Sequence, residues 1–268
     1  MPSIVEGFFG AIGRGVLPLR KDLHDASRII NDTFYWTFIS PFRGRPLRFR
    51  ASISEMVKAG YNSVPIVATI SLFVGIILAL QAAYQLKRVG ALIYVANLVG
   101  VSLTRELSPI LTAIIVSGRS GSAFAAEIGS MKAAEEVDAL TTMGINPVRF
   151  LVVPKLLALM VMLPALTMLS DLVGIFGGFL LATTAIGLHP YNYFQQTLNA
   201  LLIKDVFTGL LKALAFGVVI TLVGAYQGFK VEGGAEEVGR RTTASVVTSI
   251  FLVIIVDLFF TTLFYYFT

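Results

Sequence analysis

The sequence has no cysteine, little histidine and few charges. Its 268 residues include no Cys and two His, which excludes disulfides, thiolate nucleophiles and Cys-ligated metals, and we expect no metal site. Only 14% of the residues are charged, against roughly a quarter in soluble domains. Because 56% are hydrophobic, the composition excludes an ordinary soluble domain and predicts an all-α polytopic membrane protein.

Sequence motifs for enzymatic chemistry are also missing. There is no G-x-x-x-x-G-K-[ST] segment, so this chain has no phosphate-binding loop of its own for ATP hydrolysis. His24 and His189 are expected at interfaces or in loops, where no Ser-His-Asp arrangement can form around them. We therefore predict that the chain is not an enzyme. We also predict no nucleic-acid partner, because Lys and Arg of a membrane protein collect on its cytoplasmic side.

Long apolar runs predict five membrane-spanning helices. They cover about 62–86, 93–118, 150–185, 207–229 and 243–267. The region 148–187 is long enough for one projecting helix or for two spans. With one span, fifteen Lys and Arg lie inside and three outside; with two, the balance is thirteen to five. The positive-inside rule therefore favours five spans, with the N-terminus cytoplasmic and the C-terminus outside.

The region before the first span is amphipathic. Apolar residues recur at helical spacing between Ile4 and Val16, and an aromatic group at 34–38 precedes several arginines between 43 and 50. Aromatic rings beside cations are typical of headgroup depth. We predict an interfacial region over 1–58 and a membrane-spanning domain over 59–268. The segment 119–147 is too polar for lipid and is expected on the aqueous side.

Five ionisable residues fall inside the predicted spans. They are Arg105, Glu106, Asp171, Lys212 and Asp257. Because a charge at mid-bilayer is costly, they should face protein or water and are candidates for a transport path. The alternative is a structural role, with Arg105 and Glu106 in ion pairs with residues of neighbouring helices and Asp257 paired with Lys212 or Arg105. We expect Glu106 to have Arg105 as its counter-charge, and Lys212, nearer the outer end of its span, to extend to water.

Small residues occur at close-packing spacing in two spans. Gly174 with Gly178, and Gly224 with Gly228, form G-x-x-x-G pairs that mediate helix contacts within the chain or between copies.

One ordered set of motifs resembles a known family. Residues 103–129, LTRELSPILTAIIVSGRSGSAFAAEIG, resemble the signature of the MlaE (YrbE) permeases. The likeness continues through MKAAEEVDALTTMGINPVRFLVVPK and returns at the RRTT of 240–243 and the helix with Asp257, covering roughly 55–268. Ser108 departs from the glycine that is usual in this motif.

The resemblance implies an MlaE-type fold and a set of partners. It implies five spans preceded by an interfacial elbow helix, in a homodimeric permease of an ABC transporter that moves phospholipid between the bacterial inner membrane and an MCE protein. It implies a cytoplasmic ATPase dimer that binds ATP and Mg, so that this chain needs no cofactor. It also implies a periplasmic MCE-domain hexamer and a small cytoplasmic STAS-type regulator. The N-terminus is then cytoplasmic and the C-terminus periplasmic.

The resemblance also implies which residues bind the substrate and which contact the ATPase. Arg105, Glu106, Lys212 and Asp257 match charged positions around a phospholipid cavity between two permease copies. The predicted ATPase-coupling residues are Glu127, Glu135, Glu136, Asp138 and Gly144. In this segment a short helix that ends at a glycine would contact the ATPase.

Two functions of other classes compete with this prediction. One is a proton-coupled secondary carrier that uses Glu106 and Asp257 as proton relays. The other is a membrane scaffold that carries no substrate.

Overall fold

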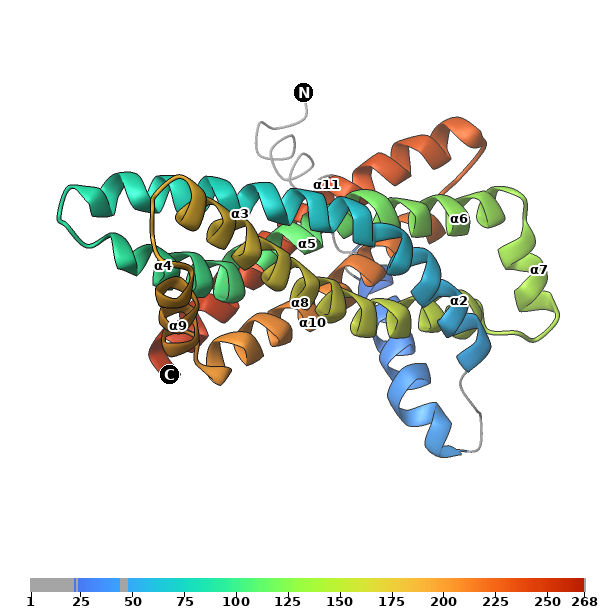
Figure 1. The fold of residues 1–268 in the computed structure, drawn as a ribbon. Helices are drawn as coiled ribbons and strands as arrows, with labels where there is room; N and C mark the ends of the chain where they lie inside the picture. The colour runs from blue at the N-terminus through green and yellow to red at the C-terminus, as the bar shows by residue number, and fades with distance from the viewer. Residues whose placement is uncertain (1–21, 23, 44–47, 268) are drawn as a thin grey trace, which may run out of the picture.

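The computed structural model describes residue 22 and residues 24–43 and 48–267, and the regular elements in these ranges are helices (Figure 1). The amphipathic pattern between Ile4 and Val16 lies outside the described residues. A helix over 24–34 comes first. The α-helices that follow are α2 (Phe49–Ala59), α3 (Val64–Lys87), α4 (Val95–Ser102), α5 (Ser108–Val116), α6 (Ser122–Ala133), α7 (Glu136–Thr142), α8 (Val153–Thr184), α9 (Pro190–Ala200), α10 (Ile203–Phe229) and α11 (Ala235–Phe267). Short 3-10 or π turns connect them: η1 (Tyr35–Ile39), η2 (Ser40–Arg43), η3 (Tyr61–Ser63), η4 (Leu92–Tyr94), η5 (Leu103–Leu107), η6 (Ser117–Gly121) and η7 (Val148–Val152).

Five helical runs are long and apolar enough to cross a membrane, which confirms the predicted all-α polytopic fold. They are Phe49–Lys87, Leu92–Ala133, Val148–Thr184, Ile203–Phe229 and Ala235–Tyr266. Val148–Thr184 is one helix, so the single crossing favoured by charge counting is correct. The first two runs are longer than their apolar stretches predict, because α2 packs against α8 and α6 packs against α10.

Proline explains the π turn that carries the first charged pair. Pro109 has no N–H, and its ring would collide with the carbonyl of Arg105, four residues earlier. The wider π turn η5 lets the helix continue through this conflict. Arg105 and Glu106 therefore lie on a locally widened turn in the first half of the second span. The same order, a π turn followed by a proline, occurs at η7 and Pro154.

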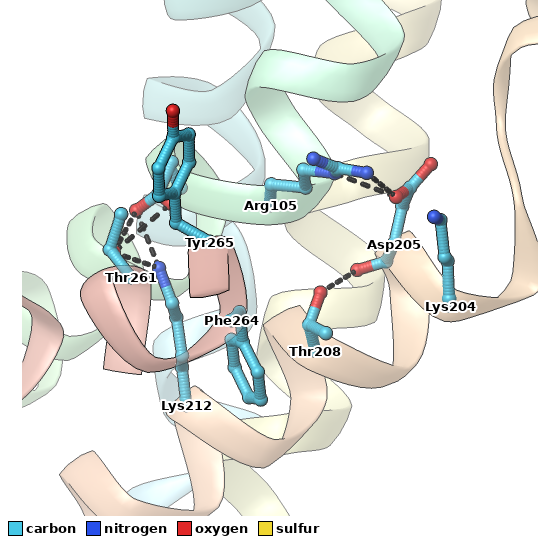
Figure 2. A pocket seen from close by; sticks show the side chains of 9 residues that line it. Arg105, Lys204, Asp205, Thr208, Lys212, Thr261, Phe264 and Tyr265 are labelled. Carbon is cyan, nitrogen blue, oxygen red and sulfur yellow. Dashed lines mark hydrogen bonds and ion pairs between the residues drawn. The ribbon is translucent and has the colours of Figure 1, made fainter. Parts of the chain in front are cut away.

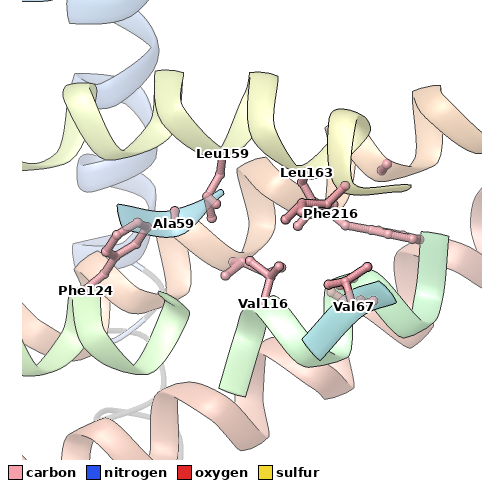
Figure 3. Packing of buried hydrophobic residues seen from close by; sticks show 12 residues of the cluster. Ala59, Val67, Val116, Phe124, Leu159, Leu163 and Phe216 are labelled. Carbon is pink, nitrogen blue, oxygen red and sulfur yellow. The ribbon is translucent and has the colours of Figure 1, made fainter. Parts of the chain in front are cut away.

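The largest apolar cluster lies where α2, α3, α5, α6, α8, α10 and α11 meet (Figure 3). Its buried members are Ala59, Val67, Ala113, Val116, Phe124, Leu159, Leu163, Leu166, Ala213, Phe216, Ile220 and Val253. α11 contributes little to this core, because only 11% of its most apolar window is buried in the chain. Its exposed face includes Val247, Phe251, Ile254 and Leu258. α11 therefore presents an apolar surface that this chain alone does not cover.

Glycines bring several helices into backbone contact. A Cβ on Gly75 would lie 1.9 Å from the carbonyl oxygen of Gly174, so α3 and α8 touch there. Both predicted G-x-x-x-G pairs lie at contacts within the chain. Gly178 faces α4, and Gly224 and Gly228 face α6. Of the two alternatives for these motifs, contacts within the chain are observed.

The bundle has two different ends (Figure 1). α2, α7 and the beginning of α11 lie at one end, called here the α7 end. α9, the turn between α3 and α4, and the end of α11 lie at the other, called here the α9 end. At the α7 end, Lys230 pairs with Asp22, which precedes the helix over 24–34, and the hydrogen bond from Lys230 holds the pKa of the Asp22 carboxyl below its usual value. This ion pair fastens the N-terminal helix to the end of α10.

Candidate functional site

A pocket of about 230 Å³ lies near the α9 end, between η5, the first turns of α10 and the last turns of α11 (Figure 2). The described residues that line it are Arg105, Glu106, Lys204, Asp205, Thr208, Lys212, Thr261, Phe264 and Tyr265. Three of the four predicted substrate-binding residues line this pocket, and the fourth, Asp257, forms an ion pair with one of them. The fold therefore brings together four charged residues from three spans.

Arg105 pairs with Asp205 at the start of α10. Its Nε donates a hydrogen bond to Asp205 Oδ1 at 2.6 Å, and an Nη atom also reaches this oxygen. Asp205 Oδ2 accepts a 3.0 Å hydrogen bond from the backbone N–H of Leu202, so the carboxylate also caps α10. The Asp205 side chain is 2% exposed and that of Arg105 is 45% exposed. The fold thus fixes the carboxylate and leaves one side of the guanidinium open to the pocket.

Lys212 connects three spans. Its ammonium donates hydrogen bonds to Glu106 Oε2 at 2.6 Å and Thr261 Oγ1 at 2.7 Å, and lies 3.0 Å from Asp257 Oδ1. Thr261 in turn donates to Glu106 Oε1 at 3.2 Å. The Lys212 side chain is 1% exposed. One buried cation therefore neutralises two carboxylates. Its attraction to them offsets the free energy that is lost when the ammonium leaves water.

Two expectations about these charges are wrong, whereas the alternative that Arg105 and Glu106 pair with residues of a neighbouring helix is observed. Glu106 pairs with Lys212, and Arg105 pairs with Asp205, because neighbouring residues on η5 point toward different parts of α10 and α11. Lys212 does not extend to water, because it lies on the face of α10 that packs against η5 and α11. Of the two partners considered for Asp257, Lys212 is observed. The ion pairs are structural facts, and contact with substrate stays a prediction for all four residues.

Sequence reasoning missed Asp205. The predicted fourth span begins at Phe207, with the continuous apolar run. Asp205 lies two residues earlier and was therefore left outside this span. A signal was present: Leu202 directly precedes α10 and Asp205 is the third residue of the helix. An acidic side chain at this third position is typical of a helix start. Lys204 and Thr261, which also line the pocket, were missed too.

A glycine aligns the two ion-pair clusters. A Cβ on Gly209 would lie 2.1 Å from the carbonyl oxygen of Thr104, so α10 rests directly on the backbone of η5. Asp205 lies about one turn before Gly209, and Lys212 lies about one turn after it. Arg105 and Glu106 follow Thr104. The contact thus places two residues of α10 opposite the charged pair of η5.

Asp171 belongs to neither cluster. It lies in α8, is 7% exposed and does not line the pocket. Within the described ranges it forms no ion pair, and its Oδ1 has no hydrogen-bond partner. The structure therefore does not connect Asp171 with the other four ionisable span residues.

The predicted coupling residues belong to α6 and the α7 segment, at the end of the bundle opposite to α9 (Figure 1). Glu136 and Asp138 are exposed in the first turn of α7, and Asp138 pairs with Lys132 at 2.8 Å. Glu135 precedes the helix with a left-handed backbone, at φ 60°. Gly144 follows the helix at φ 75° and closes it by donating to Thr141 O, as the next residue donates to Leu140 O. The segment is a short capped helix that projects from the bundle.

Glu127 has a different environment from the other coupling residues. It lies on α6 and accepts a 2.7 Å hydrogen bond from Lys155 of α8, which also pairs with Glu55 of α2 at 3.1 Å. Lys155 is 3% exposed. Lys155 therefore joins Glu127 of α6 and Glu55 of α2 to α8. A role in coupling stays a prediction for Glu127, as for the residues of the α7 segment.

Comparison with known proteins identifies the family. The family described as Permease MlaE matches residues 52–263. A probable ABC transporter permease protein of Rickettsia typhi is 38% identical over 216 residues, covering 81% of this chain and 83% of that protein. One from Synechocystis is 39% identical over 213 residues, covering 80% and 81%. The chloroplast protein TRIGALACTOSYLDIACYLGLYCEROL 1 of Arabidopsis thaliana is 31% identical over 204 residues, covering 76% of this chain and 58% of that protein. Five apolar spans and this match lead to one conclusion: the chain belongs to the MlaE family of ABC transporter permeases.

Proposed function

We propose that this permease moves phospholipids between the bacterial inner membrane and an MCE-domain protein. Two copies would enclose the lipid, with an ATPase dimer at the α7 end and an MCE hexamer at the α9 end. ATP and Mg would be bound by the ATPase, and a small STAS-type regulator would bind on the cytoplasmic side. The α7 end would be cytoplasmic, as the Lys and Arg balance favours.

The open side of Arg105 carries this proposal. Its guanidinium is held by Asp205, lines the pocket and is 45% exposed, and the exposed Lys204 lines the same pocket. A guanidinium can bind a phosphate through two parallel hydrogen bonds. Phe264 and Tyr265 add apolar surface beside the cations. A cationic group next to aromatic rings within a span suits a molecule with a phosphate and acyl chains.

Two further observations support lipid as the substrate and a second copy as the partner. The Arabidopsis relative bears the name of a galactolipid, trigalactosyldiacylglycerol. The exposed apolar face of α11 continues from the pocket, because Thr261 follows Leu258 by three residues and Ile254 by seven, which places them on one side of the helix. A second copy that packed near this face would enclose a cavity with apolar walls.

The carrier hypothesis is less well supported. The relatives from Rickettsia and Synechocystis are named ABC transporter permeases. Glu106 and Asp257, the proposed proton relays, are both held by the buried Lys212.

Removal of Arg105 tests the function. Arg105→Ala alone would leave the buried Asp205 without its cation, so we expect Arg105→Gln combined with Asp205→Asn to preserve folding. This double variant should retain about tenfold less phospholipid, because a hydrogen bond to a charged group is lost. Lipid that copurifies with the full chain is measured by mass spectrometry. Arg88→Gln, at the same end of the bundle, is the matched control. Normal lipid retention by the double variant would show that the pair is only structural.

Charge reversal at Glu136 tests the coupling segment. Glu136 is exposed in the first turn of α7, so Glu136→Lys should cost the fold at most about 1 kcal/mol through the helix dipole. A docking surface is sensitive to the sign of a charge, and we expect the variant to recover much less ATPase by affinity copurification. Glu236→Lys changes an equally exposed residue in the first turn of α11 and is the control. Equal ATPase recovery by the two variants would contradict a docking role for α7.

A further inference from the structure

A second cavity lies at the α7 end. It has a volume of about 530 Å³ and lies between η1, the start of α2 and the segment that joins α7 to η7. The described residues that line it are Trp36, Arg48, Gly144, Ile145, Asn146, Arg149 and Phe150. None of them is acidic and two are arginines. This cavity shares no lining residue with the pocket around Arg105, which lies toward the opposite end of the bundle.

Both arginines of the cavity lie over aromatic rings. The guanidinium carbon of Arg48 lies 3.9 Å from the centre of the Phe150 ring, and Arg48 Nη1 donates to Phe150 O at 3.3 Å. The guanidinium carbon of Arg149 lies 5.1 Å from the centre of the Trp36 ring. Stacking occupies the flat face of a guanidinium, while its N–H donors point outward in the plane. The rings thus orient the cations before any ligand binds.

The charge of Arg48 is not neutralised by the described chain. Arg48 forms no ion pair with a carboxylate in the ranges that the structure describes, and the bond to Phe150 O uses one of its N–H donors. An arginine that is already oriented, at the wall of a cavity without described acidic residues, favours an anion that can accept several hydrogen bonds. A phosphate group has this chemistry.

The position of the cavity indicates where the phosphate comes from. Arg48 immediately precedes the run Phe49–Lys87, and Arg149 is the second residue of Val148–Thr184, so both cations lie where apolar spans begin. The side chains of Phe42, Phe49 and Ile53 are exposed beside this end, at 91%, 64% and 59%. Basic and aromatic residues at the ends of spans lie at headgroup depth. Acyl chains could cover the exposed apolar residues while the headgroup entered the cavity.

We propose that this cavity binds the phosphate of an anionic phospholipid from the leaflet at the α7 end. The site is distinct from the pocket of the proposed transport function and does not depend on it. A lipid bound here would contact η1, α2 and η7. It would therefore hold the segment before the first span against the beginning of the third span.

The test compares lipids and variants in the full chain, purified in detergent with any subunits that copurify. The unfolding temperature is followed during titration with phosphatidylglycerol, phosphatidylcholine or inorganic phosphate. Phosphatidylglycerol should raise the unfolding temperature of the wild type at concentrations where the other two do not. In Arg48→Gln the apparent affinity should fall about tenfold, the loss of a hydrogen bond to a charged group. Arg50→Gln removes the same charge two residues away, outside the cavity, and should behave as the wild type.

Several outcomes would overturn the proposal. Equal weakening in Arg48→Gln and Arg50→Gln would show general surface attraction, and saturation by inorganic phosphate alone would show a site for a free anion. Loss of a copurifying subunit from Arg48→Gln, with an unchanged response to phosphatidylglycerol, would assign the cavity to a protein partner. Because Arg48 is exposed, its replacement should not prevent folding. These results are independent of lipid retention at Arg105, so the two proposals can fail separately.

Discussion

Replacing Lys212 with methionine should destabilise the permease strongly. The change keeps the length of the side chain but leaves Glu106 and Asp257 together without their cation. Breaking a buried ion pair by removing one partner costs about 3–5 kcal/mol. We expect a large fall in the unfolding temperature of the purified full chain and a low yield of monodisperse protein in size-exclusion chromatography.

Two further variants separate charge from packing in this prediction. Lys212→Met with Asp257→Asn removes one negative charge as well and should recover part of the lost stability. Lys204→Met removes an exposed lysine of the same pocket and should change stability by no more than about 0.5 kcal/mol. If Lys212→Met unfolds at the wild-type temperature, the Lys212 cluster is not important for the fold.

A single added methyl group at Gly209 should disturb the whole pocket. In Gly209→Ala the new Cβ would lie 2.1 Å from the carbonyl oxygen of Thr104, so α10 and η5 must move apart. Overpacking of this kind costs about 1–3 kcal/mol. The movement also lengthens the distances from Arg105 to Asp205 and from Glu106 to Lys212. We therefore expect lower phospholipid retention together with a lower unfolding temperature.

The control for Gly209→Ala is Gly239→Ala in α11. Within the described residues, no side chain and no other helix comes within 4 Å of a Cβ at Gly239, so alanine fits there and favours the helix by about 1 kcal/mol. Wild-type lipid retention in Gly209→Ala would mean that α10 can shift without disturbing the charged residues, contrary to our prediction.

The number of spans was predictable from the sequence because hydropathy reports the length of each apolar helix directly. The single crossing of 148–187 also followed from Lys and Arg positions. The beginnings of the helices were harder to predict. α2 carries the charged residues Arg50, Glu55 and Lys58, which hydropathy excludes from a span. Its buried face nevertheless packs on α8, and η3 continues α2 into α3. Tertiary contacts, which a hydropathy profile does not contain, decide such boundaries.

The site residues were predictable, but their partners were not. Arg105, Glu106, Lys212 and Asp257 can be recognised as site candidates because each is a charge inside an apolar run. This pattern is visible without knowledge of how the helices pack. Pairing depends on which helices are neighbours and on the direction of each side chain, and η5 changes that direction locally. Asp205 was missed because it lies in the first turn of α10, before the apolar run becomes continuous.

The attachment of α11 to α10 at two separate points limits how a lipid can reach the pocket. Near the α7 end, Arg241 Nη1 donates to Gln227 Oε1 at 3.4 Å, and near the α9 end Asp257 and Thr261 hold Lys212. The two attachments are about 24 Å apart along α11. Sliding by one helical turn, about 5.4 Å, would break both at once. A movement of α11 away from α10 that keeps both attachments must therefore bend the stretch between them, and this bending would also have to withdraw Val253 from the apolar cluster.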